Sequence, residues 1–136
     1  YLVGPGTTTR SIMEKLGLEN TLLGVDVVHN KKLVAGDVNE KSILEIIEGK
    51  KVKIIVTTIG GQGYIFGRGN QQLSPEVITK VGKENIIIVS TRDKLNTNFG
   101  RPLLVDTGDE EVNAWLSGYY RVIVGYEDTI MHRVTS

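Results

Sequence analysis

The sequence alternates short, solidly apolar runs with stretches that carry the signals of helices. The strands expected at 52–57 and 86–90 have centres made only of Val and Ile, at 54–56 and 86–89. Strands of this kind are typical of a parallel sheet whose two faces are both covered by helices. The alternation therefore predicts an α/β fold with a mostly parallel, Rossmann-like sheet and helices on both faces.

Further strands are expected along the whole chain. They lie at 1–3, at 22–28 as a central strand, at 33–35 as its short partner after a turn at 30–32, at 103–105, and at 120–124 and 130–134. The last two are expected to form a hairpin at the edge of the sheet. No internal repeat or linker divides the chain, which predicts one domain over residues 1–136.

Helices are expected between these strands, and capping residues mark their ends. The first helix runs to Leu16 and the second covers about 39–48, opened by a capping-box pair of Asp37 and Glu40. Ser74 followed by proline predicts a helix to about residue 81. A last helix carries Trp115, which is expected in the core.

Composition narrows the class of protein. At 136 residues the chain can bury one sizeable core, and its 16 basic and 16 acidic residues cancel. No net field therefore attracts nucleic acid or an anionic membrane. The absence of cysteine excludes disulfides and Cys-ligated metals, and no apolar run approaches the roughly 20 residues of a membrane helix. We expect a cytoplasmic protein without nucleic-acid or membrane partners.

The chain opens directly in an apolar strand, without an initiator methionine. Because natural chains rarely begin in mid-strand, we expect this one to be the C-terminal fragment of a longer protein.

Three unusual loops follow expected strands, at 4–9, 60–72 and 106–109. Ligands of open parallel sheets bind beyond the carboxyl ends of the strands. These loops are therefore the candidate binding site.

The first loop combines small and hydroxyl residues in front of a helix. Gly4 and Gly6 let the backbone approach an anion, and Thr7, Thr8 and Thr9 add hydroxyl donors. The helix N-terminus adds free N–H groups and a positive dipole end. These features predict phosphate binding; a tight turn with a plain threonine N-cap is the alternative.

The second loop has five glycines among its thirteen residues. Arg68 offers a planar fork suited to phosphate or carboxylate, and Asn70 and Gln71 both donate and accept. The alternative is a flexible surface loop, but the apolar residues 64–66 favour a loop that packs down. Its candidate ligand-binding residues are Gly60, Gly61, Gln62, Gly63, Arg68, Gly69, Asn70 and Gln71.

The sequence allows two interpretations of the role of each of four further charged residues. Asp106 and Asp109 suit a Mg²⁺–nucleotide site, with Asp106 also a candidate base, or they cap a helix. Asp26 is a candidate general base with a raised pKa, or it bonds to backbone at the end of its strand. Lys94 adds a charge at the mouth of the site or is a solvated surface lysine.

The stretches 4–9, 22–28, 59–78 and 103–109 resemble the C-terminal half of the prokaryotic, archaeal-type ATP-NAD kinase family. The resemblance implies phosphoryl transfer from ATP or polyphosphate to NAD, with ATP and NAD as substrates and a divalent metal such as Mg²⁺. The family's Gly-Gly-Asp-Gly-Thr motif belongs to an N-terminal half and is absent from this sequence. Enzymatic activity of this chain alone is therefore uncertain, and the N-terminal domain is an expected partner.

A second resemblance concerns the fold. The order of Gly-x-Gly-Thr-Thr loop, Gly-Val-Asp strand and Gly-Gly-Gln-Gly loop is similar to sugar-phosphate isomerases and deaminases, including glucosamine-6-phosphate deaminase. In that family the early loop holds a sugar phosphate. A β-sandwich, as in well-studied NAD kinases, is the alternative fold, and it would lack helices at 39–48 and 75–81. Three functions stay open: a kinase domain, a sugar-phosphate-binding domain, and a non-catalytic nucleotide-binding or homo-oligomerising module.

Overall fold

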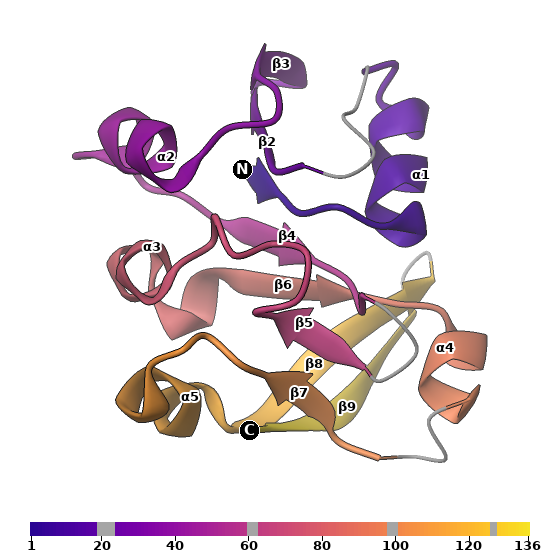
Figure 1. The fold of residues 1–136 in the computed structure, drawn as a ribbon. Helices are drawn as coiled ribbons and strands as arrows, with labels where there is room; N and C mark the ends of the chain where they lie inside the picture. The colour runs from indigo at the N-terminus through magenta and orange to yellow at the C-terminus, as the bar shows by residue number, and fades with distance from the viewer. Residues whose placement is uncertain (19–23, 60–62, 98–100, 126–127) are drawn as a thin grey trace.

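The computed structural model describes residues 1–18, 24–59, 63–97, 101–125 and 128–136 (Figure 1). Within these ranges nine strands form one sheet in the order β3-β2-β1-β4-β6-β8-β9-β7-β5. The strands are β1 (Leu2–Val3), β2 (Asp26–His29), β3 (Lys32–Ala35), β4 (Ile54–Val56), β5 (Tyr64–Phe66), β6 (Ile86–Val89), β7 (Leu103–Val105), β8 (Gly118–Gly125) and β9 (Asp128–Thr135). The helices are α1 (Thr7–Lys15), α2 (Glu40–Ile47), α3 (Pro75–Val81), α4 (Arg92–Thr97) and α5 (Glu110–Leu116), with a 3₁₀ turn η1 (Lys83–Asn85).

The sheet is mixed. Strands β1, β4, β6 and β8 are parallel neighbours, and β9, β7 and β5 form a second parallel group. The antiparallel hairpin β8–β9 joins the two groups, while β2 and β3 extend the other side in antiparallel fashion. A bridge between Ile59 and Tyr64 connects the segment after β4 with the edge strand β5, so the sheet curls. The predicted α/β class is confirmed, and helices stand at both places where a β-sandwich would lack them.

Three predictions about the strands are corrected. The expected edge hairpin is β8–β9, which lies inside the sheet because β6 and β7 pair with its two sides. The expected central strand at 22–28 is β2, second from the edge, and residues 22–23 lie outside the described ranges. Strand β5 forms inside the segment expected to be a loop. Pairing partners far along the chain decide all three positions, and local patterns carry no such information.

Adjacent strand residues face opposite sides of the sheet. Leu2 belongs to the large core under α2, α3 and α5, whereas Val3 packs with Met13 of α1 in a smaller cluster. Figure 1 shows α2, α3 and α5 along one side of the molecule and α1 and α4 along the other. The large core fixes the strands, and α1 stands over β1 at the end where its loop emerges.

Local signals set most helix ends. Ser74 caps α3 as predicted, with its hydroxyl accepting from the Val77 N–H at 3.3 Å. The cap of α2 is Asn39, not Asp37, and it accepts from the Ser42 N–H at 2.9 Å. An N-cap needs extended backbone, which Asn39 has, whereas Asp37 has a positive φ of 49°.

One core residue and one helix were predicted wrongly. Trp115 is 41% exposed, because the buried face of the short α5 consists of Val112 and Leu116, four residues apart. Helix α4 was not predicted, since its six residues carry no apolar period.

Candidate functional site

The first loop leaves β1 and enters α1, and the residues after β6 enter α4. Helix α4 brings Lys94 to this loop, where its Nζ donates to the hydroxyls of Thr7 and Thr8, each at 3.2 Å. These partners are more than eighty residues apart in sequence. The residues that follow two parallel strands, β1 and β6, thus bring an ammonium and two hydroxyls together.

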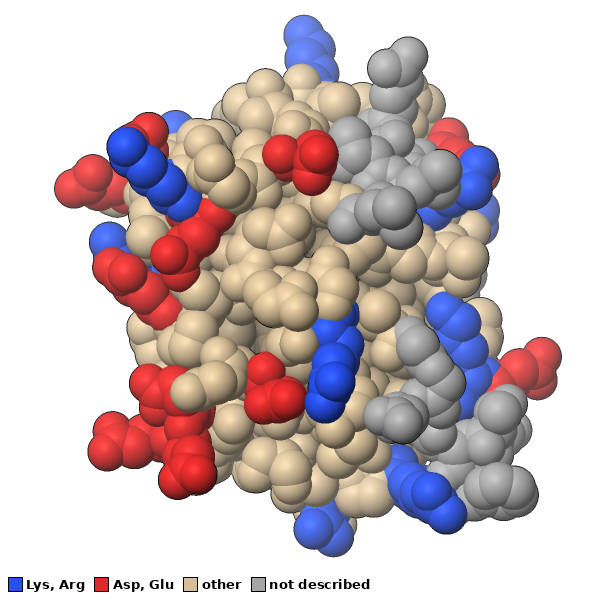
Figure 2. Space-filling model, in the orientation of Figure 1, with Lys and Arg blue, Asp and Glu red and all other residues tan. Residues whose placement is uncertain are grey.

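Lys94 has an environment that suits an anion. The part of the chain described here contains no carboxylate in ion-pair contact with it. Burial lowers the pKa of the Lys94 ammonium below its usual 10.5, because partial removal from water disfavours the charge. Figure 2 shows most of its acidic side chains on the side that carries α2 and α5, and fewer on the side of α1 and α4.

The N-terminus of α1 adds backbone donors. Its N-cap is Gly6, which offers no side-chain cap, and no acidic residue lies in the first turn. The first helical hydrogen bond runs from the Arg10 N–H to the Gly6 carbonyl. The N–H groups before Arg10 therefore have no acceptor within the helix. A plain threonine N-cap is not what the structure contains.

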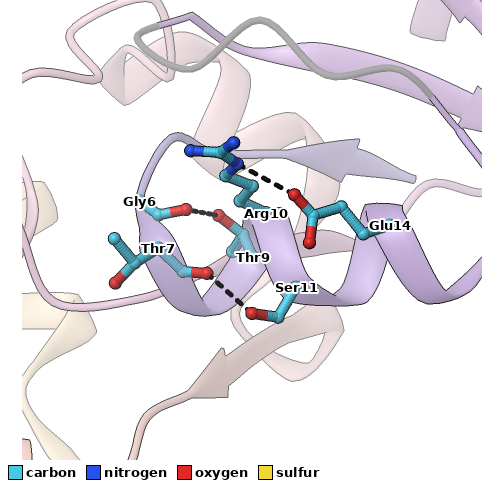
Figure 3. Close-up of polar contacts among 6 residues, drawn as sticks. All are labelled: Gly6, Thr7, Thr9, Arg10, Ser11 and Glu14. Atoms are coloured by element: carbon cyan, nitrogen blue, oxygen red, sulfur yellow. Dashed lines mark hydrogen bonds and ion pairs between the residues drawn. The ribbon is translucent and has the colours of Figure 1, made fainter.

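The three threonines of the loop differ in what their hydroxyls do, and Figure 3 shows two of them, Thr7 and Thr9. Thr9 is buried and donates back to the Gly6 carbonyl at 3.0 Å. Ser11 bonds the Thr7 carbonyl in the same way, and Arg10 pairs with Glu14 along the helix surface. The Thr9 hydroxyl therefore holds the turn, and Thr7 and Thr8 present theirs to Lys94.

Gly6 is required by its backbone and by its neighbour. Its φ of 131° is open mainly to glycine, and a Cβ there would lie 2.5 Å from Cγ2 of Thr57. Gly4 packs on β4, and a Cβ added to Gly4 would lie 4.0 Å from Nδ2 of Asn70. The first loop thus rests on the end of β4 and touches the second loop.

The second loop is held by its own side chains. Asn70 is 0% exposed; its amide donates to the Ile65 carbonyl at 2.9 Å and its oxygen accepts from the Gly67 N–H at 3.1 Å. The predicted packing of the loop is confirmed by Ile65 and Phe66, which are buried in β5. Gly63 is buried, whereas Gly69 and Gln71 are exposed; Gly60, Gly61 and Gln62 lie outside the described residues.

Arg68 already has partners. Its guanidinium lies 3.4 Å from the Asp106 carboxylate and 4.5 Å from the centre of the Tyr64 ring. Both charged side chains are about half exposed. The structure connects this residue to β7 and β5 rather than to the Thr7–Lys94 contact.

The predicted metal ligands do not form a cation site as they lie. Asp109 caps α5, accepting from the N–H groups of Glu111 and Val112 at 3.0 and 3.2 Å, while Asp106 pairs with Arg68. Within the described ranges there is no group of three or more His, Cys, Asp or Glu that could hold a metal. The magnesium requirement stays a prediction.

Asp26 lies at the start of β2 as the ladder partner of Val3. It is 3% exposed, and its carboxylate accepts from the backbone N–H of Asp37 at 3.0 Å. This is the backbone contact named as one of its two readings. Its role as a base, like that of Asp106, stays a prediction.

One polar residue near the site was not singled out from the sequence. Thr57 follows β4 and is 0% exposed, and within the described ranges its hydroxyl oxygen has no hydrogen-bond partner. The available signal was a hydroxyl residue directly after a buried parallel strand.

A family model described as the ATP-NAD kinase C-terminal domain matches residues 1–134. Neither the curated proteins nor the solved structures gave a match. No helix in the described parts of the chain is long and apolar enough to span a membrane.

Proposed function

The chain belongs to the ATP-NAD kinase C-terminal domain family, and from this premise we propose that it supplies a phosphate-binding site to a nucleotide kinase. The reaction is transfer of a phosphoryl group from ATP or polyphosphate to NAD. In this proposal the site consists of the first loop, the N-terminus of α1 and Lys94.

The observation that carries the proposal is the contact of Lys94 with Thr7 and Thr8. A partly buried ammonium lacks the solvation it has in water, and hydroxyl groups compensate only part of that loss. The dipole of α1 is positive at the same place, so the local charge is unbalanced. A phosphate group bound there would pair with the ammonium and accept from the free N–H groups of the first turn.

The remaining parts of the kinase belong to an N-terminal domain in this proposal. The family's description as a C-terminal domain implies such a partner, and the Gly-Gly-Asp-Gly-Thr motif is absent from this sequence. Asp109 and Asp106 are occupied by α5 and Arg68, so no metal-dependent step is assigned to them.

A sugar phosphate is the second candidate ligand. Its support is the position of the loop between β1 and α1, beside the buried Asp26 of the neighbouring strand. That arrangement is similar to the phosphate loop of the sugar-phosphate isomerases and deaminases. The same anion site would then hold the phosphate of a monosaccharide.

Parallel calorimetric titrations test the proposal. We expect binding of NAD⁺ or ATP–Mg²⁺ by the wild type, and about 10- to 100-fold weaker binding by Lys94→Met, the range for a lost charged hydrogen bond. Lys41→Met, at an exposed position on α2, is the matched control and should bind as the wild type does. Binding of glucosamine 6-phosphate alone would favour the second candidate. Equal affinities of Lys94→Met and the wild type would refute the site.

A further inference from the structure

The hydrogen bonding of Thr57 is unusual among the buried polar side chains of the described residues. It is 0% exposed, and its Oγ1 is the buried side-chain polar atom, among the described residues, that lacks a hydrogen-bond partner. Buried hydroxyls almost always have partners, because a lost contact with water is costly if nothing replaces it. Valine has nearly the same shape and equal preference for strands, and it would avoid this cost.

The side chain of Thr57 points at the first loop. Its Cγ2 would lie 2.5 Å from a Cβ on Gly6, the N-cap residue of α1. The position for that Cβ is also 3.8 Å from the Thr9 hydroxyl oxygen. Thr57 therefore lies directly against the turn that opens α1, with its methyl group facing Gly6.

We infer that Thr57 is a further ligand-binding residue of this anion site, and that its hydroxyl finds its missing partner in an oxygen of the bound phosphate group. This inference rests on the proposed function. A rotation of about 120° to another staggered χ1 rotamer brings Oγ1 to the place that Cγ2 now occupies, which turns the hydroxyl towards Gly6. The absence of a side chain on Gly6 leaves room for that approach.

The inference explains three facts together. The buried Thr57 hydroxyl has no hydrogen-bond partner among the described residues, and the residue against it is glycine. The Lys94 ammonium at the same loop has no carboxylate partner among those residues. A hydroxyl both donates and accepts, so it serves an ionised or a protonated phosphate oxygen. The phosphate can belong to a nucleotide or to a sugar, since the contact concerns only the phosphate group.

Two variants of the full chain separate binding from folding. Thr57→Val keeps the shape and removes the hydroxyl, whereas Thr57→Ser keeps the hydroxyl. We expect Thr57→Val to unfold at the same or a higher temperature than the wild type, yet to bind inorganic phosphate about ten-fold more weakly. Thr57→Ser should bind within about two-fold of the wild type. Thr79→Val, on the exposed surface of α3, is the control. It should bind inorganic phosphate with the affinity of the wild type.

The outcomes distinguish this inference from the function on which it rests. If Lys94→Met loses phosphate while Thr57→Val binds normally, the Thr57 inference is wrong and the anion site stands. If both variants bind as the wild type does, or the wild type binds no phosphate, both proposals fall. A Thr57→Val protein that unfolds at a clearly lower temperature would show that the hydroxyl has a structural partner, which also overturns the inference. Titration with NAD⁺ and glucosamine 6-phosphate then identifies which molecule carries the phosphate.

Discussion

Two glycine-rich loops lie beside each other in this molecule, and they treat their polar groups in opposite ways. At the first loop, the Lys94 ammonium bonds to the hydroxyls of Thr7 and Thr8, and the first turn of α1 has N–H groups without an acceptor in the helix. Beside it, the Thr57 hydroxyl has no hydrogen-bond partner among the described residues. In the second loop Asn70 uses both ends of its amide, and Arg68 has an ion pair and an aromatic ring. The sequence suggested ligand binding for both. The comparison indicates that incomplete hydrogen bonding, rather than glycine content, is what makes the first loop the better candidate for ligand binding.

The largest effect is expected where the second loop meets β7. A Cβ on Gly67 would overlap the carbonyl oxygen of Asp106, and the φ of this glycine is +90°. Gly67→Ala should therefore lower the free energy of unfolding by about 3 kcal/mol or more, because it combines overpacking with a left-handed backbone. Gly49→Ala, also at positive φ but in open space, should lose only about 1 kcal/mol. Urea unfolding of both variants measures the difference, and equal losses would contradict the structural role.

Asn70→Leu should reduce the free energy of unfolding by about 2–3 kcal/mol. It leaves the Ile65 carbonyl and the Gly67 N–H without their partners inside the fold. Phosphate affinity of the folded variant should stay within about two-fold of the wild type. Chemical unfolding and calorimetry test the two parts. If Asn70→Leu is as stable as the wild type but loses its affinity for phosphate, Asn70 belongs to the binding site and not to the structural support of the second loop.

The affinity of the first loop for anions should fall as the pH rises. Burial lowers the pKa of Lys94, so its charge is lost at a lower pH than that of a lysine in water. Binding of sulfate, whose own charge is constant, should be complete below this lowered pKa and weaken by about ten-fold as the pH rises through it. Calorimetry between about pH 7 and about pH 10 gives the profile. Lys94→Met should give a flat profile, and a flat wild-type profile would argue against the site.

The smallest effect is expected for Arg68→Ala. An ion pair that is about half exposed contributes about 1 kcal/mol or less, and the contact with the Tyr64 ring adds a similar amount. If the second loop is structural, ligand affinity should stay within about two-fold of the wild type. A ten-fold loss of NAD⁺ affinity would show that Arg68 binds the ligand. The second loop would then not be purely structural.

Local chemistry was readable from the sequence where one segment decides its own conformation. Ser74 and Pro75 predicted α3, and Gly17 ends α1, where the N–H groups of Gly17 and Leu18 bond back to the last turn. The hairpin turn before β3 has positive φ at Asn30 and Lys31, which suits the two-residue turns that connect antiparallel strands. The choice of Asp37 over Asn39 as a cap failed because both types suit the position, and only the backbone path decides between them.

The sequence by itself determined the α/β class and most of the strands, and it marked the first loop as a candidate anion site, because these follow from local period, capping and residue chemistry. The tertiary structure decided which loop keeps its polar groups unpaired. Lys94 reaches Thr7 across 87 positions of sequence, and Arg68 reaches Asp106 across 38. Such partners are selected when the sheet orders its strands, and that order depends on the burial of all its faces at once. The same long-range pairing placed Thr57 against Gly6, where its hydroxyl has no hydrogen-bond partner in the described part of the chain.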